Sequence, residues 1–234
     1  MKEPRIVLGL IRKEVGEGVF PGTSEGQPSR WKQDPFHILI STVLSQRTRD
    51  QNTYVASDRL FSRFDSPQAI ARASLKDLVE LIRPAGFPEQ KARAIKEISR
   101  RICEDLGGEV PRELERLVEL PMVGRKTANC VISYAFRIPA ICVDTHVHRI
   151  SNRIGWVKTK DPEETELELQ KMVPKDLWIE VNSLLVRFGQ LICLPRNPRC
   201  SICPIRRHCD YYTDVFLPKT GSEAATSKCH RRRR

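Results

Sequence analysis

Apolar residues recur at intervals of three and four along almost the whole chain, the spacing that places them on one face of an α-helix. No window alternates apolar and polar residues between hairpin turns, which is the pattern of half-buried strands. Residues 21–30 (PGTSEGQPSR) are polar and rich in turn-forming residues, so we expect a linker there. The pattern predicts an all-α protein.

Capping residues mark where several of these helices begin and end. Ser74, with an aspartate three residues later, predicts a helix over residues 75–83. A second helix is expected over residues 89–106, because the glycine pair that follows can adopt the left-handed backbone that ends helices. Asp161 precedes a proline and predicts a further helix start, since both residue types favour the first turn.

Residues 111–136 contain two apolar stripes separated by a short turn. The stripes consist of Leu114, Leu117 and Val118, and of Ala128, Val131, Ile132 and Ala135. This arrangement predicts a helix-hairpin-helix over about residues 111–135. Backbone N–H groups at the start of the second helix then point to one place, where the helix dipole also favours an anion such as a DNA phosphate. An ordinary helical hairpin without a ligand has the same pattern, so the geometry alone leaves both interpretations open.

Two charged residues near this hairpin are candidates for catalysis. Lys126 lies in the first turn of the second helix beside Arg125, where the dipole and the neighbouring cation both disfavour protonation. A neutral amine in that position can act as a nucleophile. Asp144, in the segment VDTHVHR, either caps the next helix or directs its charge at a cation forming in a substrate.

Four cysteines with the spacing C-x6-C-x2-C-x5-C lie near the end of the chain: Cys193, Cys200, Cys203 and Cys209. Four thiolates this close suit a tetrahedral zinc ion or an iron-sulfur cluster, and the spacing alone does not choose between them. A disulfide framework is not expected in a reducing cytosol. Three further cysteines stand at apolar helical positions, where we expect small core residues: Cys103, Cys130 and Cys142.

The charge balance makes a polyanion the first partner to consider, since 40 Lys and Arg against 29 Asp and Glu give a formal net charge of +11. Part of that excess lies in residues 213–234, which we expect to form a disordered basic tail. The sequence has no long apolar run and no signal-peptide pattern at its start. We therefore expect no membrane partner and a cytoplasmic location, beside the nucleoid if the source is prokaryotic.

The segments LPMVGRKTA and VDTHVHRI, followed by the four-cysteine run, resemble the endonuclease III family of helix-hairpin-helix DNA glycosylases in its bifunctional glycosylase/AP lyase form. The resemblance covers about residues 28–212 and the N-terminal helix. It implies two helical domains flanking a DNA-binding cleft. Residues 28–142 would form a helical bundle carrying the hairpin, and residues 1–27 with 143–212 would form the iron-sulfur cluster domain.

The resemblance also implies a base excision repair activity on double-stranded DNA containing damaged bases or abasic sites. Lys126 would attack the sugar C1′ of a flipped-out oxidised or damaged pyrimidine nucleotide, and Asp144 would stabilise the oxocarbenium-like charge. The resulting Schiff base would undergo β-elimination, which cuts the strand 3′ to the abasic site. The family implies that the four cysteines hold a [4Fe-4S] cluster in place of zinc. We expect the protein to be a monomer.

Several DNA contacts follow from the same resemblance. The hairpin would bind phosphate through the N–H groups of Val123, Gly124 and Thr127, together with Arg125. The family usually has glycine where this turn has Met122, so a side chain there can shift the turn or narrow the approach of phosphate. In the loop between the first two cysteines, Arg196 and Arg199 would face phosphates, although a solvated loop is the alternative.

Two further positions concern the flipped base. The family commonly has glutamine where this chain has Arg47, and Gln46 precedes it, so either residue can fill the gap left by the base. Phe87 matches the apolar wedge of the family, and core packing is the alternative.

Two other functions remain in view. One is a mismatch-directed glycosylase that removes uracil or thymine opposite guanine. The other is a non-catalytic DNA-binding module stabilised by its metal, which the presence of both Lys126 and Asp144 disfavours.

Overall fold

A computed structural model describes residues 2–16 and 34–218 of the chain. Within these ranges the regular structure is helical and contains no β-strand, so the all-α prediction is confirmed. The linker expected at residues 21–30 lies outside the described residues. The chain divides into two compact units between Cys142 and Val143, and the N-terminal helix belongs with the C-terminal unit.

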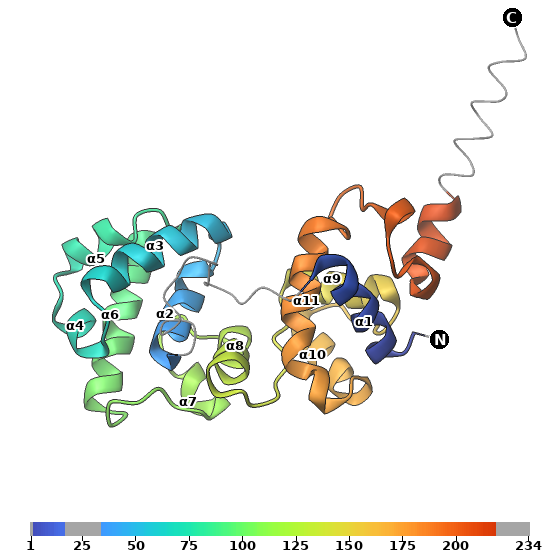
Figure 1. Cartoon of the computed structure of the whole chain (residues 1–234). Coiled ribbons are helices and arrows are strands. Elements are labelled where there is room, and N and C mark those ends of the chain that lie inside the picture. Colours follow the sequence, from blue (N-terminus) through green and yellow to red (C-terminus); the bar gives the residue numbers. More distant parts are fainter. Residues whose placement is uncertain (1, 17–33, 219–234) are drawn as a thin grey trace, which may run out of the picture. The chain divides into compact units, whose positions relative to one another are not determined.

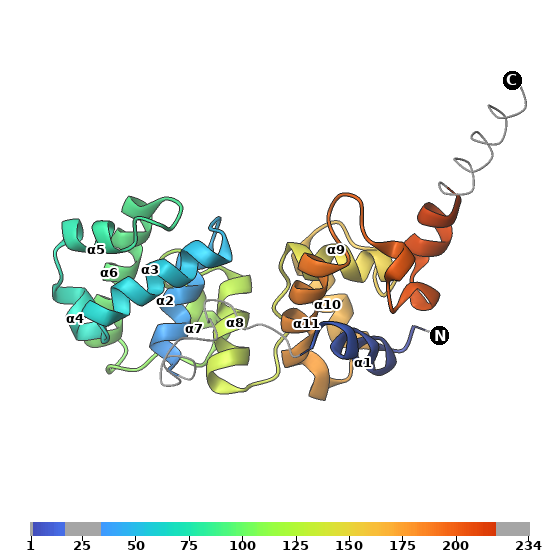
Figure 2. The same cartoon turned by 45° about the horizontal axis from the view of Figure 1, so that its top comes forward.

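The unit that ends at Cys142 is a bundle of seven helices in its described part (Figures 1 and 2). These are α2 (Pro35–Ser45), α3 (Asp50–Arg63), α4 (Pro67–Arg72), α5 (Leu75–Leu81), α6 (Pro88–Glu104), α7 (Leu114–Val118) and α8 (Arg125–Phe136). α2 is buried from Phe36 to Leu44 and packs against α3 and α8, while α6 packs against α4 and α5. A helix that is apolar on all sides belongs at the centre of a core, so α2 supports the helices around it.

The other unit begins with α1 (Pro4–Val15) and resumes at Val143 with α9 (Thr145–Ile154), α10 (Pro162–Met172) and α11 (Trp178–Leu191). α11 packs against both α1 and α9, so the two ends of the chain share one core (Figures 1 and 2). The tail expected from residue 213 does not begin there, because a π-helix covers Tyr212–Phe216. None of the described helices is long and apolar enough to cross a membrane.

The predicted helix starts are confirmed, and two predicted ends are wrong by two residues. The Ser74 hydroxyl accepts the Asp77 N–H at 3.1 Å, and an Asp161 carboxylate oxygen accepts the Glu164 N–H at 2.9 Å. α5 ends at Leu81 because Arg83 precedes a proline, which disfavours helical backbone. α6 ends at Glu104, and the N–H of the left-handed Gly108 returns to a carbonyl of its last turn.

Candidate functional site

The predicted hairpin is present, formed by α7, a turn and α8. The N–H of Val123 donates to the Leu120 carbonyl at 3.1 Å and closes the turn. This bond takes the Val123 N–H out of the set of anion donors that the sequence suggested. Met122 has a φ of 61°, the left-handed conformation that favours glycine, so the methionine at this position is strained.

The start of α8 is an exposed helix end with two basic residues in its first turn. Gly124 is its N-cap residue and, having no side chain, makes no side-chain cap. Gly124 and Arg125 are exposed and Lys126 is half-buried, whereas Thr127 is buried against the bundle. The positive end of the helix dipole and two basic side chains therefore meet at one exposed helix end.

The loop after α2 is attached to this hairpin through Gln46. Its side-chain amide donates to the Met122 carbonyl at 2.7 Å and to the Thr127 hydroxyl at 3.2 Å. The next residue, Arg47, is exposed and has a φ of 49°. Of the two residues that the sequence left open for the gap, Gln46 is thus engaged in holding the turn, and Arg47 projects from the loop.

Phe87 lies beside Arg47. The alternative of core packing is wrong, because the Phe87 side chain is 54% exposed and its backbone is left-handed, with a φ of 58°. The guanidinium carbon of Arg47 lies 6.0 Å from the centroid of the Phe87 ring. A planar cation and an aromatic ring therefore form one exposed projection on this unit.

Asp144 is the N-cap residue of α9, as one of the two sequence interpretations required. Its Oδ1 atom accepts the N–H groups of His146 at 2.9 Å and of Val147 at 2.8 Å. Both bonds use the same oxygen. Capping therefore fixes the orientation of the carboxylate without engaging Oδ2 in either bond, so a structural role does not exclude a chemical one.

Two arginines on α9 hold the loop that begins at Cys193, and the sequence analysis missed both. Arg149 donates to the Cys193 carbonyl at 2.9 Å. Arg153 donates to the Cys193 sulfur at 3.4 Å and to the Leu194 and Pro195 carbonyls at 2.7 and 2.9 Å. The signal that could have found them is their spacing of four residues, which places both on one side of the helix that Asp144 begins.

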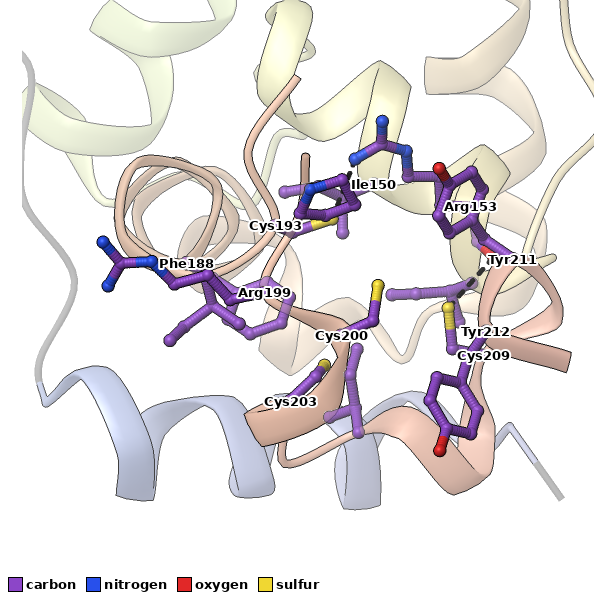
Figure 3. A pocket seen from close by; sticks show the side chains of 14 residues that line it. Ile150, Arg153, Phe188, Cys193, Arg199, Cys200, Cys203, Cys209, Tyr211 and Tyr212 are labelled. Carbon is purple, nitrogen blue, oxygen red and sulfur yellow. Dashed lines mark hydrogen bonds between the residues drawn. The ribbon is translucent and has the colours of Figure 1, made fainter. Parts of the chain in front are cut away.

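The four cysteines line a single pocket, together with Arg153, Ile205 and Tyr211. Figure 3 shows the sulfurs of Cys200 and Cys209 pointing into this space, and Arg199 pointing away from it. Arg196 and Arg199 are both exposed. The loop therefore separates its sulfurs, which face inward, from its cations, which face solvent.

The donor set fits a metal cofactor. Burial raises the pKa of the Cys203 thiol to about 12, and it also raises the pKa values of Cys200 and Cys209, with the neighbouring cysteines adding to the effect. Several thiolates gathered in one buried pocket need a cation to balance them, and a bound metal removes their protons. The residues present thus suit a thiophilic centre.

Two cysteines outside this pocket are buried in the core, as expected, but they are also paired with each other. Cys130 and Cys142 are joined in a disulfide, with their Cα atoms 5.4 Å apart, so they are not independent core residues. The sequence reasoning treated their apolar spacing as sufficient. The pairing joins residues from two segments, α8 and the stretch after it, and depends on the packing of one against the other. Cys103 is a free cysteine.

Two family models match the chain. The model described as HhH-GPD superfamily base excision DNA repair protein matches residues 40–175, and the model described as the iron-sulfur binding domain of endonuclease III matches residues 193–209. The first match contains the hairpin, Lys126 and Asp144. The second begins and ends at the outer cysteines of the four-cysteine run.

Among curated proteins, the chain is 56% identical over 179 residues to endonuclease III of Thermotoga maritima, which covers 76% of this chain and 84% of that protein. It is 40% identical over 177 residues to endonuclease III of Bacillus subtilis, which covers 75% and 81%.

Among solved structures, a trapped endonuclease III–DNA covalent intermediate matches with a TM-score of 0.81 and 33% identity, over 91% of this chain and 96% of that chain. A thermostable thymine-DNA glycosylase matches with a TM-score of 0.75 and 26% identity, over 90% and 97%. The mismatch-directed alternative is therefore less well supported than the glycosylase/AP lyase activity of the endonuclease III relatives.

Proposed function

The chain belongs to the endonuclease III family of base excision repair DNA glycosylases and lyases, and we propose that it removes oxidised or ring-damaged pyrimidines through a Schiff base on Lys126. The observation that carries this proposal is the position of Lys126 in the first turn of α8, directly after the exposed N-cap Gly124, where phosphate and amine can lie side by side. We further propose that the protein acts as a monomer in the cytoplasm, beside chromosomal DNA.

In the proposed reaction, the Lys126 amine attacks C1′ of an extrahelical nucleotide. The bond from C1′ to the base breaks, and the base leaves with one proton of the amine. The C1′–O4′ bond then breaks, and O4′ takes the second amine proton as the sugar opens to an imine. Removal of a C2′ proton then breaks the C3′–O bond, so the strand is cut 3′ to the abasic site. Asp144 stabilises the positive charge on the sugar, and the cap on Oδ1 orients its carboxylate.

The chain carries a [4Fe-4S] cluster, and we propose Cys193, Cys200, Cys203 and Cys209 as its ligands. When bound, the iron supplies a soft cationic core that thiolates coordinate, which fixes the loop. Arg196 and Arg199, exposed on the same loop, then present cations to the DNA backbone.

For the DNA contacts, we propose that Gly124 and Thr127 donate N–H groups to a phosphate, with Arg125 beside them. We propose Arg47 as the residue that fills the gap and hydrogen-bonds the orphaned base, since the Gln46 amide is engaged within the protein. Phe87 is the proposed wedge, because its exposure leaves the ring available for stacking between bases. The net charge of +11 supports attraction to a polyanion.

Borohydride trapping tests the nucleophile. With a duplex containing thymine glycol, and separately with one containing an abasic site, the iron-loaded protein should become covalently linked to the DNA and cut the strand. Lys126→Ala should lose both trapping and cutting and keep its affinity for the duplex. The assignment fails if this variant cuts as fast as the wild type. A panel of duplexes that includes G·T and G·U mismatches tests the pyrimidine preference.

A further inference from the structure

Lys91, on α6, is a buried lysine that the proposed reaction does not use. Its side chain is 1% exposed, and it is among the largest fully buried side chains in the described residues. The ammonium donates to the Leu44 carbonyl at 2.7 Å, the Gln46 carbonyl at 2.6 Å and the Thr48 hydroxyl at 2.8 Å. These three neutral oxygens match the three N–H donors of an ammonium.

All three acceptors lie in one short segment, the end of α2 and the loop after it. Thr48 extends the network, since its hydroxyl donates to the Gln46 carbonyl at 3.1 Å and accepts the Gly86 N–H at 3.0 Å. A Cβ atom on Gly86 would lie 2.7 Å from the Arg47 carbonyl oxygen, so the two loops touch through their backbones. The Lys91 network therefore joins the loop of Arg47 to the loop of Phe87.

Arg47 and Phe87, one in each of the two joined loops, both have a strained backbone. Arg47 and Phe87 have left-handed backbones, which non-glycine residues adopt only where the surrounding structure holds them. Both side chains are exposed, and the guanidinium lies against the ring. The contact between the two exposed side chains does not explain why both backbones are strained. The buried Lys91 ammonium, which is hydrogen-bonded to the loop of Arg47, does explain it.

We propose that Lys91 is a positioning residue that locks Arg47 and Phe87 into a single preformed wedge for extruding the target base. The proposal rests on the DNA roles assigned above to those two residues. Burying a charge is unfavourable unless its hydrogen bonds are satisfied, and here the satisfied bonds give the loop one conformation. Removing a base from the stack requires a few kcal/mol. A wedge that is already ordered in the free protein loses no conformational entropy on binding, so more of the binding free energy is available for unstacking.

The test compares two reactions of the iron-loaded protein. Base excision from a thymine-glycol duplex requires extrusion of a stacked base, whereas cleavage of a preformed abasic site does not. Lys91→Met should slow single-turnover excision by at least about tenfold and slow abasic-site cleavage by less than about threefold. It should also weaken the fluorescence rise of 2-aminopurine placed beside the lesion, which reports unstacking.

Lys96→Met is the matched control. Lys96 lies on the same helix and also donates to backbone carbonyls, but to those of Ala71 and Ala73 at the end of α4, which belong to neither loop of the network. It should leave both rates unchanged. Thr48→Val, which lacks the hydroxyl, should slow excision as Lys91→Met does, whereas Thr48→Ser should keep the wild-type rates. This pair keeps the test available if Lys91→Met does not fold.

Three results would overturn the positioning role. They are an equal loss of excision and abasic-site cleavage, no loss of excision, or the same loss in Lys96→Met. A wild-type protein that fails to excise thymine glycol yet cleaves abasic sites would instead contradict the proposed substrate class, and the comparison would then be made on whichever lesion the panel identifies.

Discussion

Asp144 has two roles in the structure and the proposal, and substitutions can separate them. Asp144→Ala removes the acceptor of two N–H groups at 2.9 and 2.8 Å and the negative charge at the start of α9. Loss of an N-cap acceptor costs about 1 kcal/mol, and loss of the charge about 0.5 kcal/mol more. For a chain of this length, about 1.5 kcal/mol lowers Tm by about 3–6 °C.

Asp144→Asn supplies the contrast, because asparagine caps helices as well as aspartate does. This variant should lose only the charge contribution, about 0.5 kcal/mol, and its Tm should fall by about 1–2 °C. Both variants lack the carboxylate that we propose stabilises the sugar cation, so both should lose base excision by about a hundredfold or more.

The assay measures thermal unfolding and single-turnover excision on iron-loaded proteins with matched iron content. The expected pattern is two variants equally inactive but unequal in stability. If Asp144→Asn excised at the wild-type rate, Asp144 would be a cap and nothing else. Equal Tm values for the two variants would contradict the capping argument.

Three other predictions follow from individual contacts. Met122→Gly should raise the free energy of unfolding by about 1 kcal/mol by relieving the left-handed backbone, and an unchanged denaturant midpoint would contradict this. Arg153→Met should speed iron loss to a chelator by about tenfold, followed at visible wavelengths, because the Cys193 loop loses three hydrogen bonds; an unchanged rate would show that the loop holds itself. Burial lowers the pKa of Lys91 from 10.5 to about 8, so between these pH values the unfolded chain binds more protons than the folded one. The free energy of unfolding should therefore rise with pH in this range, by up to about 3 kcal/mol relative to Lys91→Met. Denaturant titrations at several pH values measure this, and the same dependence of unfolding free energy on pH in both proteins would refute the pKa shift.

The helices were predictable from sequence because their signals are local. Apolar spacing and the caps at Ser74 and Asp161 each involve residues within one or two turns, so these signals do not depend on how distant segments pack. The four cysteines were predictable for a similar reason, since their spacing spans a single loop and its flanks.

Contacts between distant segments were not predictable in the same way. The Cys130–Cys142 pairing depends on how α8 packs on the stretch that follows it. The choice between Gln46 and Arg47 depends on a bond to the Met122 carbonyl, 76 residues away. Lys91 gave a signal that went unused: it occupies the buried stripe of α6, four residues before Ile95, where a lysine must find acceptors from another element.

α9 has a consequence for repair under oxidative stress. The helix begins at Asp144, and Arg153 lies nine residues on, so a rise of 1.5 Å per residue separates them by about 13 Å. Because Arg149 and Arg153 hydrogen-bond the Cys193 loop, α9 connects the proposed cluster ligands to the carboxylate that we propose stabilises the sugar cation. Oxidative loss of the cluster should therefore loosen the Cys193 end of α9 and disturb the orientation of the Asp144 carboxylate at its other end.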